Sequence, residues 1–144
     1  MTDEEVAKLD WKKKEIHLLR EEGFCIEIVH WTSPPYPQLG TGANHWNVYV
    51  YLFPTHPLLK TLHGSSSHDY DRVDELPFHR GCTWYEPSYD KDGKLKSVCA
   101  GSDYSHAGDE EFSFQASIPS KVTEDALELY SYVKKLKEEA DAGA

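Results

Sequence analysis

Residues 45–53 constrain the fold more than any other stretch of this chain. Apolar and aromatic side chains dominate both sets of alternating positions in this run, and Pro54 follows it directly. Such a pattern is typical of a central β-strand that is covered on each side. The sequence therefore predicts a sheet built around this strand, with other segments covering both of its faces.

Further strands are expected at residues 24–31, 82–86, 95–100 and 112–114. Between the second and third of these segments lie Asp92 and Gly93, and an Asp-Gly pair is a strong signal for a β-hairpin. A hairpin brings together the two strand ends that lie farthest from its turn. We therefore expect residues near position 79 to lie beside residues near position 103.

Helices are expected at both ends of the chain. Recurring apolar side chains predict the first helix over residues 3–22, with Gly23 as its stop. A continuous apolar stripe predicts the last helix after Pro119, with Ser120 or Thr123 as its N-cap.

Two internal segments lack any such periodicity. Residues 32–44 are rich in proline and glycine, so they form either an ordered lid beside a pocket or a long connector. Residues 64–69 are rich in glycine and serine and predict a flexible tract.

Length and composition favour a single globular domain. The chain has 144 residues, of which 39% are hydrophobic, enough for a core of its own. We therefore predict one α+β domain over residues 1–144, with a mainly antiparallel twisted sheet of four to five strands and a helix at each end. The net charge of −10 makes direct nucleic-acid binding unfavourable. The acidic start and the lack of a long apolar run predict a cytoplasmic protein that binds no membrane.

The groups capable of chemistry gather in two stretches, residues 79–84 and residues 101–109. Aspartate and neutral histidine are ligands for divalent transition metals, and glycines in the second stretch let its side chains converge. A site of this composition suits zinc or manganese, whose bound water serves hydrolytic reactions. The predicted catalytic and metal-binding residues are the same four: His79, Asp103, His106 and Asp109.

Two other interpretations of these residues stay open. The aspartates can be turn-forming residues that bond local amides, with His106 exposed at the tip of a purely structural loop. Alternatively, His106 can act without a metal, as a general base oriented by an aspartate carboxylate.

Functions without catalysis also stay open. The protein can be an acidic interaction protein, such as a phage-encoded inhibitor that presents an acidic face to a basic host protein. It can also bind a small molecule, with residues 32–44 as a lid. The acidic residues that would form the interaction face are Asp69, Asp71, Asp74, Glu75, Glu110 and Glu111.

The two chemical stretches also carry a resemblance. Residues 48–57 end near a His-Pro pair, residues 79–84 read His-Arg-Gly-Cys-Thr-Trp, and residues 101–109 read Gly-Ser-Asp-Tyr-Ser-His-Ala-Gly-Asp. In this order the stretches resemble a family of small uncharacterised phage and bacterial proteins. That family has His-Gly-Gly-(Ile/Leu)-Thr-(Phe/Tyr), then Gly-Phe-Asp-x-x-His-x-Gly-Asp. The likeness covers roughly residues 46–110.

The resemblance implies a shared site and a setting, but no activity, because the family has none established. It implies that the four predicted site residues belong to one motif set, and that the protein acts in a bacterial or phage-infected cytoplasm. The chain departs from the family at Arg80, where the family has glycine, and at Ser102, where it has an aromatic residue.

Overall fold

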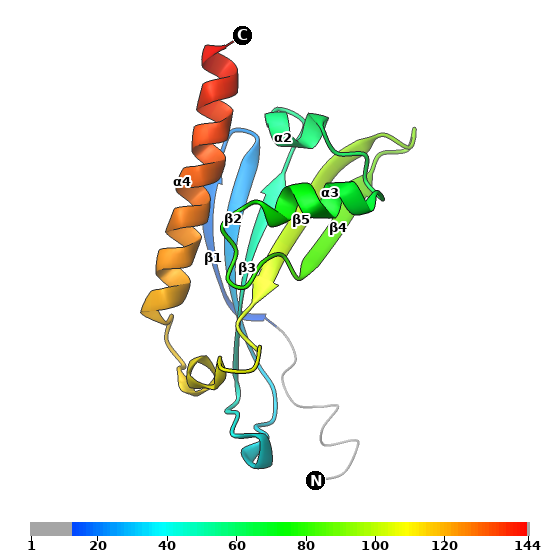
Figure 1. The fold of residues 1–144 in the computed structure, drawn as a ribbon. Coiled ribbons are helices and arrows are strands. Elements are labelled where there is room, and N and C mark those ends of the chain that lie inside the picture. Colours follow the sequence, from blue (N-terminus) through cyan, green and yellow to red (C-terminus); the bar gives the residue numbers. More distant parts are fainter. Residues whose placement is uncertain (1–12, 144) are drawn as a thin grey trace.

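One antiparallel sheet of five strands forms the centre of the protein, in the order β1-β2-β3-β5-β4 (Figure 1). The structure is a computed structural model that describes residues 13–143. The strands are β1 Lys13–Glu21, β2 Phe24–Thr32, β3 Asn44–Leu52, β4 Trp84–Tyr89 and β5 Leu95–Asp103.

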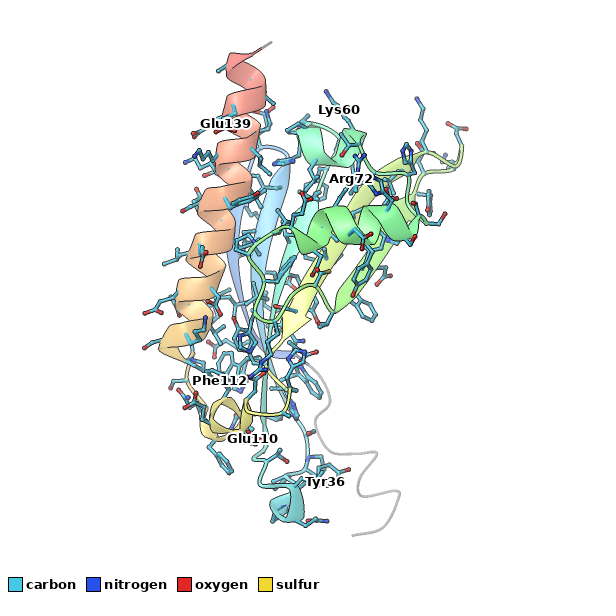
Figure 2. The ribbon with its side chains drawn as sticks, viewed as in Figure 1. Tyr36, Lys60, Arg72, Glu110, Phe112 and Glu139 are labelled. Carbon is cyan, nitrogen blue, oxygen red and sulfur yellow. The ribbon has the colours of Figure 1, made fainter. Side chains whose placement is uncertain are left out.

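Helices lie on one face of this sheet (Figure 1). The α-helices are α2 Pro57–Lys60, α3 Ser67–Asp74 and α4 Ser120–Ala142, and the 3₁₀ helices are η1 Pro37–Leu39 and η2 Glu110–Phe114. Figure 2 shows Tyr36, Glu110 and Phe112 toward one end of the molecule, and Lys60 and Glu139 toward the other. The predicted α+β class, with a mainly antiparallel sheet and a C-terminal helix, is confirmed. Among residues 13–143, no helix is long and apolar enough to cross a membrane.

The core forms between the sheet and the helices. The buried side chains of β3 alternate along the strand and join buried residues of all three α-helices in one cluster. From the strands this cluster includes Trp46, Val48, Val50, Leu52, Val98 and Ala100, and from the helices Leu59, Val73, Val122, Ala126, Leu129 and Val133. The strand at residues 45–53 is therefore central, as predicted.

Among residues 13–143, helices cover one face of β3 only, so the predicted cover of its second face is not found there (Figure 1). Its other alternating positions include Tyr49 and Tyr51, which are half-buried, and no helix of residues 13–143 covers them. Tyrosine tolerates this environment because its ring packs on neighbours while its hydroxyl finds a polar partner, as in Tyr51, which donates to Glu27 at 3.5 Å. We call this side of the sheet the open face.

The helix predicted over residues 3–22 is also wrong where it can be compared. Residues 13–21 form β1, which pairs with β2 along its length, and the earlier part of the prediction lies outside the described residues. Gly23 does not end a helix but turns a tight hairpin, with a φ of +88° that suits glycine. The apolar residues of this segment fit the period of a helix as well as that of a strand. Hydrogen bonding to β2 therefore decides that the segment forms a strand.

Residues 112–114 form part of η2 and not the predicted strand. The Ser113 hydroxyl fixes this turn, because it donates to the carbonyl of Glu110 at 2.5 Å and accepts from the amide of Gly42 at 2.7 Å. The segment is therefore tied to the proline-rich loop, which lies far away in the sequence.

Two helix starts also differ from the predictions. The tract at residues 64–69 is not a flexible connector, since Ser66 caps α3 by accepting from the amide of His68 at 3.1 Å. At α4, Pro119 is the N-cap and no side chain caps the helix, so neither Ser120 nor Thr123 has the predicted capping role.

Candidate metal centre

The hairpin of β4 and β5 brings the two chemical stretches together, as the sequence predicts. His79 lies between α3 and β4, whereas Tyr104 follows directly after β5. Their rings stack with a centroid separation of 4.3 Å and an interplanar angle of 9°. Residues near position 79 therefore lie beside residues near position 103 in space.

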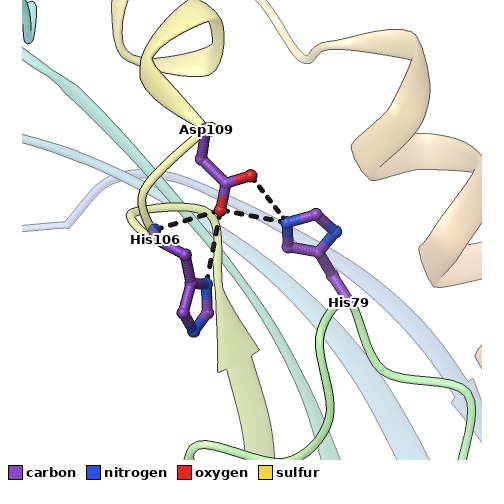
Figure 3. A group of neighbouring side chains, drawn as sticks. All are labelled: His79, His106 and Asp109. Atoms are coloured by element: carbon purple, nitrogen blue, oxygen red, sulfur yellow. Dashed lines mark hydrogen bonds and ion pairs between the residues drawn. The ribbon is translucent and has the colours of Figure 1, made fainter.

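Asp109 is the centre of the resulting cluster (Figure 3). Its side chain is only 2% exposed, and both of its oxygens accept from His79 Nε2, at 2.9 and 3.0 Å. Asp109 Oδ2 also accepts from the backbone amide of His106 at 3.0 Å and lies 3.3 Å from His106 Nδ1. Burial raises the pKa of this carboxyl, but the hydrogen bonds from His79 and His106 outweigh it, so the pKa is lowered.

Three of the predicted site residues can reach a common ion. His79, His106 and Asp109 each offer one ligand atom, and these atoms lie within 4.8 Å of one another. Two imidazoles and one carboxylate form a donor set that binds zinc, manganese or ferrous iron in other proteins. The geometry thus provides a candidate site for a divalent cation.

Asp103 lies beside this group without belonging to it. Its Oδ1 is 3.4 Å from His106 Nδ1 and accepts from the backbone amide of Ser105 at 3.0 Å. The second interaction is the local turn bond expected of an aspartate in a structural loop. Because its side chain is 37% exposed, Asp103 remains accessible to a ligand at the site.

Arg80 is a feature of the site whose contact was not predicted. Its backbone has a φ of +57°, in the left-handed region that favours glycine, and the resembled family has glycine at this position. The side chain runs past Gly108, and its Nε lies 3.5 Å from Asp109 Oδ1. A half-exposed cation therefore stands next to the buried carboxylate.

A cavity of about 370 Å³ adjoins the cluster. His106 and Asp109 line one side of it, and Leu39 and Thr41 of the proline-rich loop line another. The loop at residues 32–44 thus borders a pocket, and its role as a lid stays a prediction. His45 also lines the cavity, and burial lowers its pKa with a further contribution from His30. The sequence marks His45, at the start of the predicted central strand, only as a secondary candidate for the site.

The acidic residues that the sequence singled out for an interaction face do not all lie at the surface. Asp69 is fully buried, and its Oδ2 accepts from the backbone amide of His63 at 2.8 Å. Asp74 accepts from the backbone amide of Cys82 through Oδ1. Asp69 is therefore removed from any acidic face, whereas Asp74 is exposed although it holds the backbone at Cys82.

Comparison of the chain with models of known families, with curated proteins and with solved structures gives no match. The resemblance to phage and bacterial proteins stays a prediction from the motifs.

Proposed function

We propose that the protein binds a divalent metal ion, zinc or manganese, and uses it in a hydrolytic reaction. The observation that carries the proposal is the convergence of ligand atoms from His79, His106 and Asp109 within 4.8 Å. The adjoining cavity of about 370 Å³ gives room for a small substrate. The resemblance of residues 79–84 and 101–109 to phage-encoded proteins supports a single site and a cytoplasmic setting in a bacterial or infected cell.

The donor set suits this chemistry because three protein ligands leave a coordination position for water. A divalent metal ion held by His79, His106 and Asp109 would activate a water molecule for attack on a substrate. Asp103, whose side chain is 37% exposed and lies close to His106, is the carboxylate available to take the proton from that water. In such a hydrolysis the new bond to the water oxygen would replace the bond to the leaving group, which would take up the proton held by Asp103.

A metal-free function is the second candidate, and a specific contact favours it. Asp109 Oδ2 lies 3.3 Å from His106 Nδ1, the arrangement in which a carboxylate orients an imidazole as general base. His106 Nε2 would then accept the proton, and neither ring would need a metal. Metal binding separates the two candidates directly.

The test is the metal content of protein purified without chelator and without an affinity tag. Elemental analysis should give one zinc or manganese ion per chain, either after purification or after loading and desalting. Substitution of either histidine ligand, in His79→Gln or His106→Gln, should lower the affinity at least ~100-fold, since even loss of outer-shell partners costs 10–100-fold.

His68→Gln is the matched control, because His68 is exposed on α3 and belongs to no metal-binding group found in residues 13–143. It should bind metal as the unaltered protein does. Stoichiometric binding that persists in both ligand variants would place the ion elsewhere. Absence of binding altogether would leave the metal-free candidate, which predicts that any hydrolytic activity survives exhaustive chelation.

A further inference from the structure

A groove on the open face of the sheet is separate from the histidine cluster. Strand β5 presents small side chains on this face, whereas its neighbours β3 and β4 present large ones. The resulting cavity has a volume of about 330 Å³, and its lining includes Tyr49, Tyr51, Trp84, Glu86, Ser97 and Cys99. We call it the β5 groove.

The strand register fixes the walls of the β5 groove. Gly101 of β5 pairs with Tyr49 of β3 on one side and with Trp84 of β4 on the other. A Cβ atom at Gly101 would lie 2.2 Å from Cδ1 of Tyr49, so the tyrosine ring rests directly on the glycine backbone. The next row on the same face consists of Tyr51, Cys99 and Glu86. An aromatic wall therefore faces an edge strand that carries a tryptophan and a carboxylate.

Two side chains of the edge strand β4 are exposed and can contact a partner. Trp84 is 51% exposed, although tryptophan side chains are usually largely buried. Glu86 is exposed, and no residue in the described part of the chain forms a hydrogen bond or ion pair with its side chain. No lysine, arginine or histidine lines the β5 groove among residues 13–143. The groove thus combines aromatic surface with the carboxylate of Glu86.

We propose that the β5 groove binds an arginine or lysine side chain presented by a basic segment of a partner protein. A cation is attracted to the face of a tryptophan ring, and a nearby carboxylate adds an ion pair. The net charge of −10 steers basic partners toward the protein and repels nucleic acid. Pro87 lies in the same edge strand and has no amide hydrogen, which disfavours recognition by strand addition. Side-chain recognition is therefore the mode that fits.

The test uses a blocked peptide of alternating glycine and arginine residues as the probe, with the full-length protein and calorimetry at low salt. Trp84→Ala and Glu86→Gln should each weaken binding about tenfold, as expected for loss of a cation–π contact or a charge-assisted bond. The matched controls are Tyr132→Ala and Glu128→Gln, an exposed aromatic and an exposed acid one turn apart on α4. These controls should change the affinity less than twofold.

Each alternative result overturns the proposal. Equal weakening by the groove variants and the α4 variants would show diffuse attraction to an acidic surface. Failure of the peptide to bind would remove the cation as the ligand. Self-association that Trp84→Ala abolishes, measured by sedimentation, would make a second copy of the chain the occupant. Metal binding should be unchanged in both groove variants, which keeps this test independent of the histidine cluster.

Discussion

Histidine has two different environments at opposite ends of β3. His56 follows the strand and is fully buried, with Nδ1 accepting from the amide of Leu58 at 3.1 Å and Nε2 donating to the carbonyl of Val133 at 3.0 Å. His79 lies at the other end, where its Nε2 donates to the carboxylate of Asp109. Within residues 13–143, the ring nitrogens of His56 form hydrogen bonds with backbone groups only, whereas His79 bonds to an ionisable side chain beside a cavity.

The difference explains why one site is structural and the other is a candidate for chemistry. The partners of His56 join α2 to α4, and they leave the neutral ring no free nitrogen. At the cluster, two imidazoles share one carboxylate, and a metal ion can replace the shared protons. Burial alone does not identify a functional histidine, because the more buried of the two is the one fixed by backbone groups.

The largest expected effect is on metal affinity. Asp109→Asn should lower the affinity for zinc at least ~100-fold, because the amide removes the charged ligand while it keeps the shape. His56→Asn should leave the affinity within twofold. The measurement is competition with a chromophoric chelator, and similar losses in both variants would erase the distinction between the two histidine environments.

The free energy of unfolding should depend more on His56 than on the histidines of the metal site. His56→Ala should lower the free energy of unfolding by about 2–3 kcal/mol, because it leaves a cavity and strips partners from the Leu58 amide and the Val133 carbonyl. His106→Ala should cost less than about 1 kcal/mol, since this side chain is partly exposed. Urea denaturation of apo protein gives both values. A larger loss in His106→Ala would mean that the cluster, and not α2, anchors the fold.

Acid should destabilise the protein through His56. Burial is the main cause of the lowered pKa of this histidine, which falls below the ordinary value of 6.5. The unfolded chain therefore binds a proton at a higher pH than the folded chain, and stability is lost as the pH falls below 6.5. One such group changes the free energy of unfolding by at most ~1.4 kcal/mol per pH unit.

The measurement is urea denaturation between pH 7.5 and pH 5.5. His56→Gln should make the pH dependence shallower but not flat, because the pKa of half-buried His45 is lowered as well. An unchanged slope in His56→Gln would show that the ring is not held neutral by the fold.

The smallest effect concerns Arg80. Arg80→Gly should be more stable than Arg80→Ala by ~1 kcal/mol, because only glycine adopts the φ of +57° without strain. Both variants remove the cation beside Asp109 and should raise metal affinity a few-fold. Thermal unfolding measures the stability of both variants. Equal stability would show that the backbone at Arg80 is not strained, as the backbone around His56 is not.

Much of the candidate site could be predicted because it depends on local signals. Asp92 and Gly93 specify the hairpin, and the hairpin alone places position 79 beside position 103. The contact of Arg80 with Asp109 could not be predicted, because it depends on a backbone conformation that is rare for arginine. The coordination of Asp103 stays a prediction, since it contacts His106 from outside the group of three residues.

The sequence by itself determined the central strand at residues 45–53, the hairpin of β4 and β5, and the long amphipathic α4. In each case an alternation, a turn pair or a helical stripe is encoded within a few neighbouring residues. Tertiary structure decided that residues 13–21 form β1, that residues 112–114 form a 3₁₀ turn, and that the helices of residues 13–143 cover one sheet face only. These outcomes depend on partners distant in sequence, whose hydrogen bonds and buried surface outweigh weak local preferences.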